Sequence, residues 1–506
     1  MNSAPSSNRS EIRPWPALWS LVLGFFMILV DTTIVSVANP SIMRGLDTTM
    51  VATLWATSAY LLAYAVPLLI TGRLGDRFGP RRIYLVGLTV FTLSSLACGL
   101  AGGIETLVAA RVFQGLGAAL MTPQTMAVIT RIFPPRERGS AMAVWGVTAG
   151  VATLVGPILG GFLVDAWGWQ WIFFINVPVG VIAFVLALRF VPVLPTHAHR
   201  FDWLGVLLSA VGMFLLVFGI QEGESFDWGT IWGPITVWSL IIAGVVVLAL
   251  FVFWQRVQRG EPLIPLQIFR DRNFSVGSAV IVTVGFSVTG MALPLMFYLQ
   301  LVRGLTPTQS ALMMVPMAVL SILLARPIGL LIDRRDPRRL PVLGLLLVAA
   351  GLASYALMAR PDISLWLLLI PSAVLGLGNA FMWGPLASIT TFSLAQDLAG
   401  AGSGVYNTSR QVGAVLGSAA MAAFMGSRIA AHFGPAAADA AGGFGGATGG
   451  SGALPAALQG DFSAAMAESI LMPMGVMILG ALVALLFARR PKSAREAAQE
   501  AAAAAK

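Results

Sequence analysis

The stretch GRLGDRFGPRRI, residues 72–83, recurs in the second half of the chain as GLLIDRRDPRRL, residues 329–340, with Asp76 matching Asp333. Each copy follows a long apolar run and carries arginines after the acid. Two further matching segments come later in the two halves, GLGAALM at 115–121 and GLGNAFM at 376–382. Matching segments in the same order predict that one half of the chain repeats the other.

The composition predicts that both halves lie in a membrane. Charged residues make up 10% of the chain, hydrophobic residues 57%, and the mean hydropathy is +0.83, whereas soluble domains carry roughly a quarter charged residues. A helix that crosses a bilayer needs about 20 mostly apolar residues. Fourteen such runs are predicted, near 17–39, 51–71, 82–102, 106–130, 139–164, 169–190, 203–220, 233–255, 274–301, 306–330, 339–358, 363–391, 401–427 and 468–488.

The repeat assigns twelve of these runs to two bundles, because parallel repeats of membrane helices with a site between them build many secondary transporters. The seventh and eighth runs lie between the repeats and are predicted to be a linker pair. The expected fold is an all-α membrane protein. Its predicted parts are a cytoplasmic N-terminus at 1–16, a six-helix bundle at 17–190, two linker transmembrane helices at 203–255, a six-helix bundle at 274–488 with an external Gly/Ala-rich loop at 434–460, and a cytoplasmic tail at 489–506.

The positive charges predict the orientation. If the N-terminus is cytoplasmic, most of the 31 Lys and Arg residues fall on the cytoplasmic side, and the external segments hold only Arg44, Arg303, Arg360 and Arg428. This asymmetry predicts that both termini are cytoplasmic. The net charge of +9 is thus explained by membrane topology, without a nucleic-acid partner.

Asp31 is the acid that the apolar runs do not explain. It lies roughly halfway along the first run, in ILVDTTIVSVANP, residues 28–40. A charged carboxylate at the centre of a membrane helix costs about 2.5 to 3.5 kcal/mol, so it must face water, pair with a cation or be protonated. A proton and a substrate that compete for it would be coupled by exclusion. Arg111, a few residues into the fourth run, stays charged and is a candidate to tune Asp31.

The two repeated loops are predicted to act as gates at the cytoplasmic surface. An acid with arginines at a helix end can hold two bundles together by charge and by the helix dipole, and glycines allow the helices to approach closely. The second loop has Asp336 where the first has Gly79. The candidate gating residues are Gly72, Asp76, Arg77, Gly79, Arg81, Arg82, Gly329, Asp333, Arg334 and Arg338.

Several motifs together resemble the major facilitator superfamily, and in particular its fourteen-span drug:proton antiporter branch of the EmrB/QacA type. They are GRLGDRFGPRR at 72–82, RVFQGLG at 111–117, GVTAGVATLVGPILGG at 146–161, VDTTIVSVANP at 30–40 and WQWIFFINVPVG at 169–180. The resemblance implies proton-linked roles for Asp31 and Arg111. It also implies export, because in this family the fifth-span motif marks exporters. The residues of this antiporter helix would be Gly146, Gly150, Gly156, Pro157, Gly160 and Gly161.

The thirteenth run aligns on the fifth but carries Asn407, Arg410 and Gln411. An intramembrane arginine marks a pathway or a paired site, yet runs nine to thirteen offer no acid at mid-membrane depth to pair with it. A neutral or singly charged lipophilic cargo is therefore expected in place of a multiply charged cation. The candidate cavity residues are Gln114, Trp145, Asn379, Trp383, Tyr406, Asn407, Arg410 and Gln411.

The sequence thus predicts a proton-coupled antiporter that exports lipophilic compounds by alternating access, as a monomer in the bacterial inner membrane. Its partners would be the cargo, protons and the bilayer, with no cofactor, no metal and no enzymatic activity. The only lysines, Lys492 and Lys506, lie in the tail, so a phosphate-binding loop for ATP hydrolysis is missing. Export of one endogenous metabolite, such as an antibiotic, siderophore or lipid, stays an alternative, as does a uniporter or channel.

Overall fold

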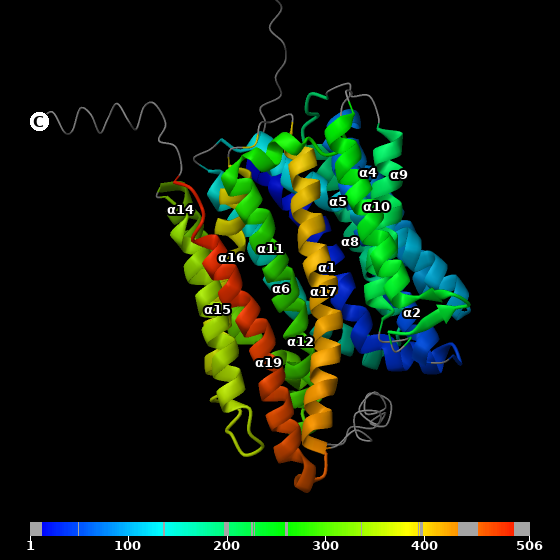
Figure 1. Cartoon of the computed structure of the whole chain (residues 1–506), viewed down its shortest axis with the longest axis vertical. Coiled ribbons are helices and arrows are strands. Elements are labelled where there is room, and N and C mark those ends of the chain that lie inside the picture. The colour runs from blue at the N-terminus through cyan, green and yellow to red at the C-terminus, as the bar shows by residue number, and fades with distance from the viewer. Residues whose placement is uncertain are drawn as a thin grey trace, which may run out of the picture.

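The computed structural model of the chain describes residues 13–48, 50–134, 137–196, 202–223, 226, 228–258, 262–334, 336–392, 394, 398–433 and 454–489. These residues form long helices that run side by side along one axis of the molecule (Figure 1). The protein is a mostly helical membrane protein, as predicted. The N-terminal bundle comprises α1 (Pro14–Gly45), α2 (Met50–Ala65), α3 (Leu68–Phe78), α4 (Pro80–Gly99), α5 (Ile104–Ile132), α6 (Arg138–Trp167), α7 (Trp171–Phe174) and α8 (Asn176–Phe190).

The C-terminal bundle repeats this arrangement with longer interruptions. In Figure 1 α14, α15, α16 and α19 lie on the left of the molecule, away from α4 and α5 on the right. The bundle comprises η1 (Leu266–Arg270), α11 (Arg272–Gly290), α12 (Ala292–Phe297), η2 (Tyr298–Val302), α13 (Pro307–Leu312), α14 (Val315–Arg334), α15 (Arg339–Met358), α16 (Leu369–Thr391), α17 (Ala399–Phe433) and α19 (Ala456–Ala484).

The two linker helices, α9 (Trp203–Gln221) and α10 (Val237–Val257), pack against each other. A short antiparallel hairpin, β1 (Thr230–Trp232) with β2 (Ile235–Thr236), connects them, a feature that an all-α prediction missed. Asp202 holds the other end of the pair, because its carboxylate accepts hydrogen bonds from Trp254 Nε1 at 2.9 Å and Gln255 Nε2 at 2.7 Å. Although partial burial acts to raise its pKa, these hydrogen bonds hold the pKa of Asp202 below its ordinary value.

Helices occupy all fourteen predicted ranges, but the count of fourteen spans is not confirmed. Among the described residues, 12 helices are long and apolar enough to cross a membrane, and 13 if α2 and α3, bent by 47°, are one span. The bend lies at Pro67, which cannot continue the helix. In α6, the predicted fifth span, the apolar helical stretch among the described residues is Val155–Val164, which is too short to count as a span.

Two boundaries of the last span and its loop differ from prediction. The final span was expected to begin at residue 468, yet α19 begins at Ala456, so residues 456–460 of the predicted loop 434–460 are helical. The polar residues in LQGDF made this turn resemble a loop, whereas the helix begins directly after Pro455. Residues 434–453 of the loop, the N-terminal residues 1–12 and the tail from 490 lie outside the described residues.

The bundles meet along two seams. At the first seam α3 and α5 pack against α17, and at the second α6 packs against α13, α14 and α16. The first seam is also covered by the linker pair, because α9 contacts both α2 and α17. Met213 and Val217 of α9 are buried there in one cluster with Ala65 of α2 and with Val412 and Val415 of α17. The inserted helices therefore connect the two repeats through space as well as along the chain.

Candidate transport site

Asp31 lies inside the N-terminal bundle and is fully buried, with a relative exposure of 0%. Its carboxylate accepts hydrogen bonds from Arg111 Nη1 at 2.6 Å, Gln114 Nε2 at 2.9 Å and Asn176 Nδ2 at 3.1 Å. These donors come from α5 and α8, so one acid of α1 ties three helices together. Of the three ways in which a membrane acid can be tolerated, this protein uses pairing with a cation.

The guanidinium of Arg111 is equally enclosed. It donates to Gln114 Oε1 at 2.8 Å and, through Nε, to the carbonyl of Ala56 at 3.1 Å. Its Cζ lies 4.0 Å from the ring centroid of Tyr60, which makes a cation–π contact. A buried pair of this kind is costly to break, because removing one partner leaves an uncompensated charge.

An aromatic and polar link leads from this pair to the other bundle. Tyr60 and Tyr64 lie one turn apart on α2, with ring centroids 6.1 Å apart. The hydroxyl of Tyr64 forms a hydrogen bond with Thr122 Oγ1 at 3.1 Å. It also accepts a hydrogen bond from Arg410 Nη2 of α17 at 3.4 Å. The Asp31 pair is thus joined through Arg111, Tyr60 and Tyr64 to an arginine of the C-terminal bundle.

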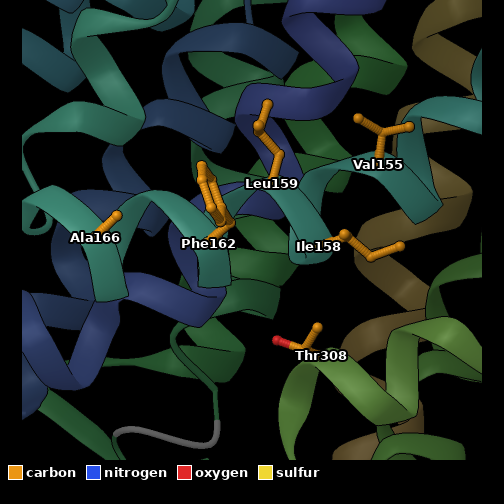
Figure 2. Close-up of a pocket in the computed structure, with 6 residues that line it drawn as sticks. All are labelled: Val155, Ile158, Leu159, Phe162, Ala166 and Thr308. Atoms are coloured by element: carbon orange, nitrogen blue, oxygen red, sulfur yellow. The ribbon is translucent and has the colours of Figure 1, made fainter.

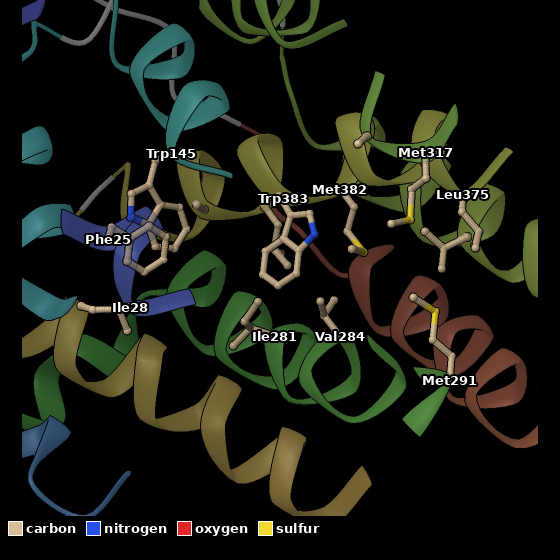
Figure 3. Close-up of a cluster of buried hydrophobic side chains, with 14 of the residues drawn as sticks. Phe25, Ile28, Trp145, Ile281, Val284, Met291, Met317, Leu375, Met382 and Trp383 are labelled. Carbon is tan, nitrogen blue, oxygen red and sulfur yellow. The ribbon is translucent and has the colours of Figure 1, made fainter. Parts of the chain in front are cut away.

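Aromatic side chains fill the space between the bundles next to this link. Figure 3 shows Trp145 of α6 stacked on Phe25 of α1, with Trp383 of α16 beside them and Ile281 and Val284 of α11 below. The rings of Trp145 and Phe25 have centroids 5.0 Å apart. Two of the predicted cavity residues, Trp145 and Trp383, therefore lie in one buried cluster that both bundles contribute to.

The other predicted cavity residues have different surroundings. Gln114 does not face the space between the bundles, because its amide group binds Asp31 and Arg111. The three-residue spacing from Arg111 puts Gln114 on the same helix face as the arginine, and its role in a cavity stays a prediction. The remaining predicted residues are buried or partly buried on α16 and α17, namely Asn379, Tyr406, Asn407, Arg410 and Gln411.

Asp76 closes the first seam at the end of the molecule where α3 ends and α17 begins, which we call the Asp76 end. Its carboxylate, 1% exposed, accepts Arg131 Nη2 at 2.6 Å and the backbone N–H groups of Gly400 at 3.2 Å and Ala401 at 3.1 Å. The acid of the N-terminal bundle thus caps the first turn of a helix in the other bundle, where the helix dipole favours negative charge.

Glycines let the helices approach at this end of both seams. A Cβ atom on Gly72 would lie 2.5 Å from the carbonyl oxygen of Gly400, and one on Gly329 would lie 2.7 Å from Ser140 Cα of α6. Both distances are shorter than real Cβ contacts, so only glycine fits. The Asp76 end is therefore closed along both seams in this structure.

The remaining gating candidates of the first loop have other surroundings. Gly79 ends α3 with a φ of +93°, a conformation that suits glycine. Arg81 donates to the carbonyl of Leu188 within its own bundle, and Arg77 contacts the ring of Phe78. Arg82 is exposed.

The second loop forms no copy of the Asp76 arrangement within the described residues. Arg338 pairs with Asp336 at 3.2 Å, and both side chains are partly exposed. Asp336 is the residue by which this loop departs from the first. Asp333 and Arg334 end α14, and their side chains lie outside the described part of the structure.

Helix α6, which contains the predicted antiporter-helix residues, has glycines on two faces. A Cβ on Gly160 would lie 2.7 Å from Ile34 of α1, and Gly156 approaches Thr33 still more closely. Towards the other bundle, a Cβ on Gly146 would lie 2.7 Å from Trp383 Cβ, and one on Gly161 would lie 2.9 Å from Thr308 of α13. Pro157 interrupts the hydrogen bonding between these positions. The surroundings of Gly150 lie outside the described residues.

A groove of about 720 Å³ lies beside the C-terminal half of α6. Figure 2 shows its side chains along α6, with Thr308 on the facing helix. Phe162 and Ala166 are exposed, and the lining is mostly apolar, formed by Val155, Ile158, Leu159, Phe162, Ala166 and Thr308. The groove therefore runs along the outer part of the second seam, which α9 does not cover.

Sequence reasoning missed several residues of the site. Asn176 stands in the quoted WQWIFFINVPVG motif, and it binds both Asp31 and Ser95 at 3.1 and 3.0 Å. Arg131, which pairs with Asp76, lies in the last turn of α5 and belongs to no quoted motif. Tyr60 and Tyr64 carry no motif, and only their four-residue spacing on α2 indicates a shared face.

We expect replacement of Asp76 by Asn to weaken closure of the first seam and to slow transport by about threefold to tenfold. The amide oxygen can still accept an N–H of α17, but the charge that binds Arg131 and the helix terminus is lost. Transport rates of Asp76→Asn, Arg131→Gln and the double variant measure the coupling, and the double variant should be little worse than either single one. Asp336→Asn is the matched control, because its pair is exposed and worth little. Fully additive effects would contradict the proposed ion pair.

The helices, the two seams and the buried ion pair define a membrane transporter built from two repeated bundles. The chain belongs to the Major Facilitator Superfamily, which it matches over residues 21–418. Its fold is also that of a solved family member, the proton:xylose symporter XylE, with a TM-score of 0.64 at 14% identity, covering 96% of this chain and 98% of that one.

Curated relatives are transporters of the same superfamily. An uncharacterized MFS-type transporter of Mycobacterium tuberculosis is 50% identical over 472 residues, 93% of this chain and 80% of the relative. The tetracenomycin C resistance and export protein of Streptomyces glaucescens is 37% identical over 425 residues, 82% of this chain and 77% of the relative. Relatives named for resistance to antibiotics or for their export thus align with most of the chain.

Proposed function

We propose that the protein exports lipophilic small molecules across the bacterial inner membrane in exchange for protons, as a member of the drug:proton antiporter branch. The observation that carries this proposal is the fully buried Asp31–Arg111 pair, held by Gln114 and Asn176. An ionisable acid at that depth is a functional site by default. The names of the relatives support export as the direction of transport.

The geometry favours a coupling route that differs from direct competition at Asp31. Three donors occupy the carboxylate, so cargo in the space between the bundles does not reach it. Protonation of Asp31 would instead release Arg111 from its partner and alter its contact with Tyr60. Tyr64, next on the same helix face, touches Arg410 of the other bundle. Proton binding and movement of the bundles would thus be linked through α2.

Alternating access requires the seams to open in turn. The Asp76 end, predicted to be cytoplasmic, is held by Asp76 on α17 and by the Gly72 and Gly329 approaches. Release of these contacts would open the space between the bundles towards the cytoplasm for loading. Protonation of the Asp31 pair can shift the equilibrium between the closed and the open Asp76 end only if the pair binds the proton more tightly in one of these two states than in the other.

Inverted membrane vesicles with an acidic lumen and a luminal pH dye test the proposal. Tetracenomycin C, the compound named for one relative, and a panel of lipophilic dyes are added outside. We expect the lumen to become alkaline as cargo enters, and vesicles lacking the protein to show no response. Uptake of cargo without luminal alkalinisation would contradict antiport, and a response to a single compound would favour a dedicated metabolite exporter.

A further inference from the structure

Arg410 lies at the interface of the bundles without an acidic partner. It is partly buried on α17, about 16 Å along the helix axis from Ala399 at 1.5 Å per residue. No carboxylate within ion-pair distance of it occurs in the part of the chain that the structure describes. Its one described side-chain partner is the hydroxyl of Tyr64, at 3.4 Å, which is neutral. Among the described residues, no acid therefore balances the charge of this arginine.

The groups around Arg410 are suited to an acceptor. Tyr406 lies one turn before it on the same helix face, is fully buried, and has a hydroxyl without a hydrogen-bond partner among the described residues. Tyr64 reaches the same place from the N-terminal bundle. A guanidinium without an acidic partner can bind a carboxylate or phenolate with charge-assisted hydrogen bonds.

Asp31, the acid that the sequence places at membrane depth, does not offset the charge of Arg410. Asp31 is bound to Arg111 at 2.6 Å and enclosed by Gln114 and Asn176, so it gives a cationic cargo no free carboxylate. The sequence alone, in which Asp31 is the acid at depth, suggested a neutral or monocationic cargo. Of the two charges now placed, Asp31 is paired and Arg410 is not, so the described residues of the site between the bundles favour a negative group.

We infer that Arg410, with Tyr64 and Tyr406, forms a binding site for an anionic group of the cargo, so that the preferred substrates are lipophilic carboxylates or phenolates. The inference rests on the proposed export function and names its substrate class. Aromatic side chains of the same interface, Trp145 and Trp383, would contact the apolar part of such a cargo. Binding of an anion across Arg410 and Tyr64 would also engage both bundles at once.

Three probes of matched shape test this inference on the purified full-length protein. 9-Anthracenecarboxylate, its carboxamide and 9-anthracenemethylammonium share one ring system and carry a negative, a neutral and a positive polar group, and energy transfer from tryptophan reports their binding. We expect the carboxylate to bind at least tenfold more tightly than the carboxamide and the ammonium compound to bind most weakly. Arg410→Gln should remove the preference, and Arg410→Lys should keep part of it because the charge remains.

Arg428→Gln is the matched control. This arginine lies on the same helix but pairs with Glu468 at 3.7 Å, so its replacement should leave the order of the three probes unchanged. Equal affinities for the three probes, absent binding of the carboxylate, or an unchanged preference in Arg410→Gln would overturn the inference. These outcomes are distinct from failure of the proposed function. Arg410-dependent binding without luminal alkalinisation would refute antiport alone, and alkalinisation with charge-blind binding would refute the anion site alone.

Discussion

Replacing Asp31 by Asn is expected to abolish cargo-driven proton release, lowering it at least tenfold in the inverted-vesicle assay. The variant has no group at this position that can exchange a proton. The asparagine can still accept one hydrogen bond from Arg111, but the negative charge that balances the arginine is gone. Loss of one partner of a buried pair costs about 3–5 kcal/mol, so less folded protein is also expected, and rates are compared per folded molecule.

A second measurement separates loss of coupling from loss of structure. Exchange of labelled for unlabelled cargo at equal concentrations needs no net proton movement, so Asp31→Asn should retain it while proton release disappears. Asp31→Glu, which restores an acid, should recover part of the proton release. Glu468→Gln is the matched control, because Glu468 pairs with Arg428 in membrane helices but is 43% exposed. Normal proton release by Asp31→Asn would refute the assignment of the proton site.

Replacing Gly72 by Val is expected to force the first seam open at the Asp76 end and to reduce transport tenfold or more. The added Cβ would lie 2.5 Å from the Gly400 carbonyl oxygen and 3.2 Å from Gly404 Cα. These are backbone atoms, which cannot swing away as a side chain can. Overpacking of this kind costs about 1–3 kcal/mol, and about 1.4 kcal/mol shifts a two-state equilibrium tenfold.

Labelling of an introduced cysteine can measure the opening of the first seam directly. The single native cysteine, Cys98, is buried with 0% exposure, so a cysteine introduced at Ser403 would report alone. Ser403 is 1% exposed and donates to the Pro123 carbonyl across the seam at 2.8 Å. Labelling at this site by a water-soluble maleimide should rise in the presence of Gly72→Val. Gly475→Val is the control, because a Cβ there meets no atom within 4 Å, and unchanged labelling in Gly72→Val would contradict the closed seam.

The repeat and the hydropathy of the chain were enough to predict the two-bundle fold, because both follow from local sequence. The pairing of Asp31 with Arg111 was a hypothesis that the motifs raised, and the structure gives it a distance of 2.6 Å. The contact between Gln114 and Arg111 could have been predicted, because residues three apart lie on one helix face.

The rest depends on contacts between segments far apart in the chain. Asn176 reaches Asp31 only because α8 packs on α1, and Gly400 receives Asp76 only because α17 begins at the end of α3. The charge preference could not be predicted either. It required knowing that Asp31 is already paired with Arg111 inside the N-terminal bundle, while Arg410 reaches from the C-terminal bundle to Tyr64.

The position of α9 restricts how the molecule can move. Because Met213 and Val217 pack against α2 and α17 together, rotation of one half against the other must shear these contacts or pivot close to them. Pivoting is the smaller disturbance, so the rotation axis should run near α9, and displacements should grow with distance from it. The greatest separation then falls on the opposite flank, between α6 and α13, where a hydrophobic molecule could pass sideways between the protein interior and the surrounding lipid.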